Sequence, residues 1–184
     1  MEQSKVIVDK INKLIQTNID REKGYERAIE QADDDQLKGY FQECCNVSAE
    51  YILQLKPFVE QYGGVPVEDS STAGDMYRAW MDLRSGLTAN NDKATLKSCE
   101  KGEDVAVNAY KEVTSDHDVP LAPHLMQVIN EQQAKIQSMH NQIKSLRDSQ
   151  EWMAGLLKPR AAVEQKLQLL LCVMSDKTLQ SGLA

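Results

Sequence analysis

The sequence has few of the residues that interrupt helices or build β-sheets. Its 184 residues include only 9 glycines and 5 prolines, and aromatic side chains make up 5% of the chain. Residues that favour helices, such as Gln, Glu, Lys, Leu and Ala, are abundant instead. We therefore expect an all-α protein, with enough residues for one domain of ordinary size and a tail.

The chain also lacks long apolar runs and dense basic segments. No stretch approaches the roughly 18 apolar residues that a membrane-spanning helix requires. The first residues, Met1–Lys5, do not form a basic segment followed by an apolar one, so no secretory signal is expected. With a net charge of -7 and no run of Lys or Arg, the chain has no electrostatic basis for binding nucleic acid. We expect a cytoplasmic protein that binds neither nucleic acid nor membranes.

Cysteines are few and show no paired spacing. Cys44, Cys45, Cys99 and Cys172 include no Cys-x-x-Cys pair, so reduced thiols that pack as small apolar residues are the default expectation. The neighbours Cys44 and Cys45 are expected to face different directions on a helix. One of the two is therefore a candidate reactive thiol.

Apolar residues recur at helical spacing in four long segments, and the first two form a predicted hairpin. The run Asp33–Asp35 supplies N-cap oxygens for the second helix. That helix contains Pro57, which predicts a kink or a loosened last turn, and it ends at Gly63–Gly64. Because the connection between the two helices is short, they should pack antiparallel.

A second hairpin is predicted after a long crossover. The crossover carries a short amphipathic helix over residues 73–87. A helix then runs from a cap at Asn90–Asp92 to just before Ser115, and the next begins near Pro123 and continues through Leu146. We therefore expect two helical hairpins, with residues 1–148 forming an antiparallel four-helix bundle.

Residues 149–184 continue with a second amphipathic pattern that the bundle does not need. Apolar residues recur at Leu156, Val163, Leu167 and Leu170, which predicts a helical C-terminal extension. The extension either folds back on the bundle or meets a second copy of the chain. We favour self-association, as a dimer or higher oligomer, because the apolar stripe would otherwise be exposed to water.

Counting the rise of about 1.5 Å per residue brings six potential ligands from four helices to one level of the bundle. They are Glu22, Glu26, Glu43, Glu100, Glu103 and His140. Buried carboxylates are costly unless they are paired or bound to a cation, so this layer is a candidate metal site. Alternatively, Glu22 and Glu26 lie at the wet edge of their helix, Glu100 and Glu103 belong to a solvated face, and His140 is a core or rim residue.

The hairpin, crossover, hairpin order with inward glutamates resembles the ferritin-like superfamily. Its di-iron members use a glutamate from each of two helices and a Glu-x-x-His pair from each of the other two. Three segments are similar to an uncharacterised bacterial family of four-helix-bundle proteins of unknown function, and the similarity covers roughly residues 5 to 147. These segments read Arg21-Glu22-Lys23-Gly24-Tyr25, Ala79-Trp80-Met81-Asp82-Leu83 and Cys99-Glu100-Lys101-Gly102-Glu103-Asp104.

The resemblance implies a carboxylate site for iron or another divalent transition metal, but both paired motifs depart from the pattern. The second helix reads Glu43-Cys44-Cys45-Asn46, and the fourth reads Gln137-Ser138-Met139-His140. Each departure removes an expected ligand. We therefore expect a stress-related or structural interaction protein with a degenerate site, no catalytic residues and no certain cofactor. The alternative is a metal-binding protein that acts in metal handling or oxidative-stress defence, where any enzyme activity would be that of a di-iron oxidase or peroxidase.

Overall fold

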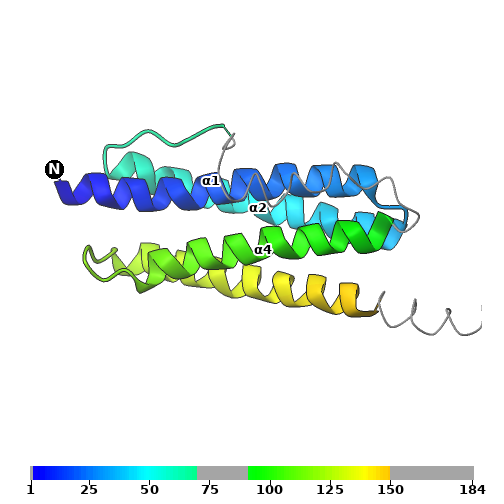
Figure 1. The fold of residues 1–184 in the computed structure, drawn as a ribbon. Coiled ribbons are helices and arrows are strands. Elements are labelled where there is room, and N and C mark those ends of the chain that lie inside the picture. The colour runs from blue at the N-terminus through cyan, green and yellow to red at the C-terminus, as the bar shows by residue number, and fades with distance from the viewer. Residues whose placement is uncertain (1, 70–90, 150–184) are drawn as a thin grey trace, which may run out of the picture. The chain divides into compact units, whose positions relative to one another are not determined.

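The computed structural model describes residues 2–69 and 91–149, and these residues form helices and no strands. Helix α1 spans Glu2–Gln31, α2 spans Asp35–Gln61 and α4 spans Asn91–Ser115, while a further helix, here called the last helix, covers residues 123–149 (Figure 1). The all-α prediction is confirmed, and these helices are consistent with a four-helix bundle. The predicted helix at residues 73–87 lies outside the described residues, as does the extension 149–184 after its first residue.

The ends of α2 are fixed by the residues that the sequence pointed to. Asp34 is the N-cap, and its side chain accepts hydrogen bonds from the backbone N–H groups of Gln36 and Leu37. The helix continues through Pro57 and ends at Gln61. Gly63 follows with φ of 75°, a left-handed conformation that glycine adopts without steric cost.

Hydrogen bonds at the two ends of α1 define the direction of the other helices. The backbone N–H of Asp33 donates to Asp92 Oδ1 at 2.7 Å, so α4 starts where α1 ends. At the other end, Lys10 Nζ donates to Val119 O at 3.1 Å, so the turn after α4 lies beside the start of α1. Helix α4 is therefore antiparallel to α1, and the last helix runs in the same direction as α1 (Figure 1).

The described residues on the two sides of positions 70–90 contact opposite ends of α1. Asn12 near the start of α1 holds the segment after α2, because its side chain donates to Val65 O and accepts from Val67 N. The chain re-enters the bundle at Asn91, at the opposite end of α1. The segment after α2 and the start of α4 therefore lie at opposite ends of α1, as expected for two hairpins joined by a crossover.

The core follows one seam on each helix, with alternating steps of three and four residues. On α1 the seam includes Ile11, Leu14, Tyr25 and Ala28, all with 0% exposed surface. The residues Met1–Arg147 form one compact unit. Among the described residues, no helix combines the length and the hydropathy needed to cross a membrane.

Candidate functional site

An ion pair lies in the interior of the bundle, between Arg21 on α1 and Glu103 on α4. Both side chains are fully buried, and Arg21 donates to Glu103 Oε1 from Nη2 at 2.7 Å and from Nε at 3.2 Å. The hydroxyl of Tyr25, one turn after Arg21, donates to the same oxygen in a short hydrogen bond. Charged side chains are almost never fully buried unless they are paired, and this pair meets that condition.

The remaining donors of Arg21 connect the pair to the other two helices. Nη1 donates to Ser48 Oγ on α2 at 3.0 Å and lies 3.5 Å from Asn18 Oδ1. Nη2 also lies 3.9 Å from the sulfur of Met139 on the last helix. One guanidinium therefore contacts side chains from all four described helices at a single level.

A chain of hydrogen bonds continues from this level toward the start of α1. Asn18 Nδ2 donates to the Tyr110 hydroxyl at 2.7 Å, and that hydroxyl donates to Gln132 Oε1 at 2.8 Å. Gln132 Nε2 then donates to Gln54 Oε1, again at 2.8 Å, and Gln54 is exposed. The polar network thus extends from the buried ion pair to the surface of α2.

The electrostatics of the site favour the charged form of Arg21. Burial is the largest single effect and lowers the pKa of Arg21, but the charge of Glu103, the Tyr25 phenol and the hydrogen bond to Glu103 together outweigh burial, and the net pKa is raised above its usual value. The pKa of Tyr25 is also raised, first by burial and then by the Glu103 charge, so the phenol keeps its proton. Arg21 and Tyr25 therefore remain donors to Glu103 at neutral pH.

The two oxygens of Glu103 differ in their surroundings. Oε1 accepts three hydrogen bonds, whereas Oε2 is buried and has no hydrogen-bond partner within the part of the chain that the structure describes. A buried polar atom without a partner is rare in folded proteins.

The six predicted ligands do not form one group. Glu103 is buried on Arg21, whereas Glu22 is half-buried and Glu26 is exposed. Burial raises the pKa of Glu22, and the neighbouring charge of Glu26 adds to the effect. Glu22 and Glu26 therefore lie at the solvent-exposed edge of the buried face of α1. This agrees with the alternative interpretation of the sequence, in which these two glutamates are not metal ligands.

The other three candidates bind different partners at the surface or rim. Glu43 forms an exposed ion pair with Lys135 at 3.2 Å, and Glu100 forms an ion pair with Arg147. His140 Nε2 lies 2.8 Å from Asp104 Oδ1. Across residues 2–69 and 91–149 there is no group of three or more His, Cys, Asp or Glu side chains that could hold a metal ion. Metal binding stays a prediction, without a ligand group in these residues to support it.

Of the six predicted ligands, only Glu103 belongs to the buried network, and residues next to two of the others take part in it instead. Arg21, next to Glu22, and Met139, next to His140, both contact the buried pair. Successive residues on an α-helix point about 100° apart, so a shift of one residue exchanges an inward side chain for one at the rim.

A pattern in the sequence could have identified these residues. On α1 the spacing of Ile7, Ile11, Leu14, Tyr25 and Ala28 leaves two positions of the same seam between Leu14 and Tyr25. Polar side chains occupy both of these positions and the corresponding seam positions of the other helices. These polar seam residues are Asn18, Arg21, Ser48, Glu103 and Gln132.

The sequence predicts that Cys44 and Cys45 face different directions and that one of them is a candidate reactive thiol. The structure does not support a reactive thiol at either position. Both residues are buried, with 0% and 4% exposed surface, because α2 packs against α1 as well as toward the interior. The Cys45 thiol lies 3.6 Å from the carbonyl oxygen of Glu22. Burial raises the pKa of Cys44 to about 12 and that of Cys45 to about 11, so neither is an activated thiolate.

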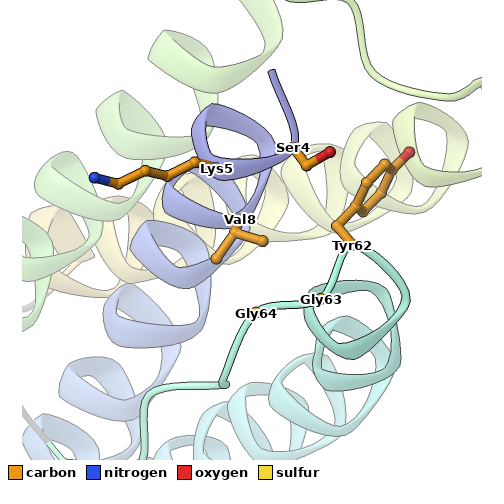
Figure 2. Close-up of a pocket in the computed structure, with 6 residues that line it drawn as sticks. All are labelled: Ser4, Lys5, Val8, Tyr62, Gly63 and Gly64. Atoms are coloured by element: carbon orange, nitrogen blue, oxygen red, sulfur yellow. The ribbon is translucent and has the colours of Figure 1, made fainter. Parts of the chain in front are cut away.

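A separate pocket lies where the start of α1 meets the end of α2. Ser4, Lys5, Val8, Tyr62, Gly63 and Gly64 line it. Figure 2 shows the Lys5 side chain extending away from Tyr62, and Gly64 passing close to Val8. The pocket is open to solvent and no buried charged group lines it, so the buried network is the stronger candidate site.

Comparison with known proteins adds one finding. No curated protein matches the sequence. The family described as "Domain of unknown function (DUF2383)" matches residues 6–116, which cover most of α1 and all of α2 and α4 and amount to more than half of the chain. The protein therefore belongs to this family.

Proposed function

We propose that this protein is a ferritin-like bundle that acts as a structural or interaction protein, and that an internal ion pair takes the place of a metal at its waist. The observation that supports the proposal is the contact of Arg21 with Glu103, with both side chains fully buried. The guanidinium supplies the positive charge that a buried carboxylate needs. No divalent cation is then required to balance Glu103.

The fixed charge of Arg21 also opposes metal binding at the same carboxylate. At about 4 Å and an effective dielectric constant of about 20, two like unit charges repel by about 4 kcal/mol, and a divalent ion doubles this. Two further predicted ligands, Glu43 and Glu100, already have cationic partners in Lys135 and Arg147. The arrangement therefore suits a stable scaffold better than an ion-exchanging site.

The interaction role rests on the sequence of residues 149–184. Its apolar residues recur at helical spacing and include Leu167 and Leu170. We propose that this extension joins two or more copies of the chain, because a second copy offers the same apolar stripe.

Metal analysis and oligomeric mass test the two parts separately. Protein purified from iron-supplemented cells should contain far less than stoichiometric transition metal, and it should not accelerate aerobic Fe(II) oxidation. Stoichiometric metal would contradict the ion-pair proposal. In the full chain, Leu167→Glu should lower the mass measured by light scattering, whereas Gln168→Glu, which adds the same charge one residue away, should not. An unchanged mass for Leu167→Glu would contradict self-association through the extension.

A further inference from the structure

The buried oxygen Glu103 Oε2 has no hydrogen-bond donor among the side chains that the structure describes. An ionised carboxylate has about two acceptor sites on each oxygen. Of the two carboxylate oxygens, Oε1 accepts from Arg21 and Tyr25, whereas Oε2 is buried without a partner among the described residues. Leaving a buried charged acceptor unpaired is costly, so a small donor at this position would stabilise the fold.

Two thiols face the interior one helical turn from the ion pair. Cys99 precedes Glu103 by four residues on α4, and Cys44 precedes Ser48 by four residues on α2, where Ser48 accepts from Arg21. Both cysteines have 0% exposed surface. Residues four apart lie on the same face of a helix, so Cys99 lies on the face of α4 that carries Glu103, and Cys44 lies on the face of α2 that carries Ser48.

The pKa values of the thiols agree with this placement. Burial is the main reason that the pKa of Cys44 and that of Cys99 are raised, and the negative charge of Glu103 raises both further. Protonated thiols are weak donors and weak acceptors. They can therefore complete the hydrogen bonds of a small polar molecule held at Glu103.

The charges of Arg21 and Glu103 indicate that this molecule is neutral. Arg21 and Glu103 balance each other, so an added cation would face the guanidinium and an added anion would face the carboxylate. A neutral donor with two to four hydrogen-bonding groups around it fits the position, and water is the smallest such donor.

We propose that the core holds one buried water molecule, which donates a hydrogen bond to Glu103 Oε2 and contacts the thiols of Cys44 and Cys99. The proposal gives a reason for cysteine at these two seam positions. A larger apolar side chain at either one would fill the space that the water needs.

A crystal structure of the full chain, at a resolution that shows ordered water, tests the proposal directly. The expected result is one density peak at about 2.6–3.2 Å from Glu103 Oε2, with a cysteine sulfur as a second neighbour. A structure with no peak at Oε2 would overturn the proposal, whether or not a protein group occupies the position.

Water relaxation dispersion gives a test in solution with a matched variant. The double substitution Arg21→Met with Glu103→Leu removes the acceptor and keeps an apolar interior, so the number of long-lived internal waters should fall by one relative to the natural chain. The control Cys99→Ser keeps a small hydrogen-bonding group beside Glu103 and should leave the number unchanged. Equal numbers in the natural chain and the double variant would contradict the proposal, and if the double variant does not fold the crystal structure alone decides.

Discussion

Replacing Arg21 by methionine leaves the Glu103 carboxylate inside the bundle without its counter-charge. Both side chains are fully buried, and Glu103 has no other cationic partner within residues 2–69 and 91–149. Breaking a buried ion pair from one side costs about 3–5 kcal/mol, because the remaining charge stays desolvated. For a chain of this size that cost corresponds to a fall in melting temperature of roughly 6–20 °C.

The double variant Arg21→Met with Glu103→Leu separates the loss of the pair from the cost of the unpaired charge. Apolar replacement of both partners removes the buried charge, and such replacements are often neutral or stabilising by about 1–4 kcal/mol. The hydroxyl of Tyr25 then loses its acceptor, at a cost of about 1–3 kcal/mol. We therefore expect the double variant to recover most of the stability that Arg21→Met loses.

The assay is guanidinium and thermal unfolding followed by circular dichroism, with Lys135→Met as the matched control. Lys135 pairs with Glu43 at the surface, where 46% and 52% of the two side chains are exposed. Because solvent screens such a pair, its loss should cost less than about 1 kcal/mol. If Arg21→Met proves no more destabilising than Lys135→Met, the buried ion pair contributes no more to the free energy of unfolding than a solvent-exposed pair does, and our reasoning is refuted.

Four further results are expected. Cys44 and Cys45, with pKa values raised to about 12 and about 11, should react with Ellman's reagent at about pH 8 only as fast as the protein unfolds; rapid labelling of both would contradict their burial. A raised thiol pKa favours the protonated thiol in the folded state, so its contribution to stability is full below the unfolded-state pKa of 9.0 and falls as the pH rises toward the folded-state pKa values. The denaturation midpoint should therefore be lower at about pH 10.5 than at about pH 8. The substitution Cys44→Val should reduce that difference. Gly39→Ala should stabilise α2 by up to about 1 kcal/mol, since the added Cβ meets nothing within 4 Å. Gly64→Ala should destabilise by about 1–3 kcal/mol, because its Cβ would lie 2.5 Å from Val8 Cγ1; equal effects of the two glycine variants in denaturant unfolding would count against the close approach.

Much of the fold follows from local features of the sequence. Asp34 at the start of α2 and Gly63 after its end act through hydrogen bonds and backbone conformations that involve only nearby residues. The three- and four-residue spacing of apolar side chains gives the helices, and their lengths give the level at which they meet. These properties depend on residues within one or two turns, so the sequence determines them.

Which side chains face one another at that level depends on the tertiary structure. Burial of Arg21 is favourable only because Glu103, 82 residues later in the chain, supplies the opposite charge. Without that partner, Glu22 is as plausible an inward residue as its neighbour, since a rotation of about 100° separates them. The sequence by itself determined the helices and the height of the polar layer, and only the packing of α1 against α4 decided that an ion pair lies inside the layer while Glu22 and Glu26 lie at its edge.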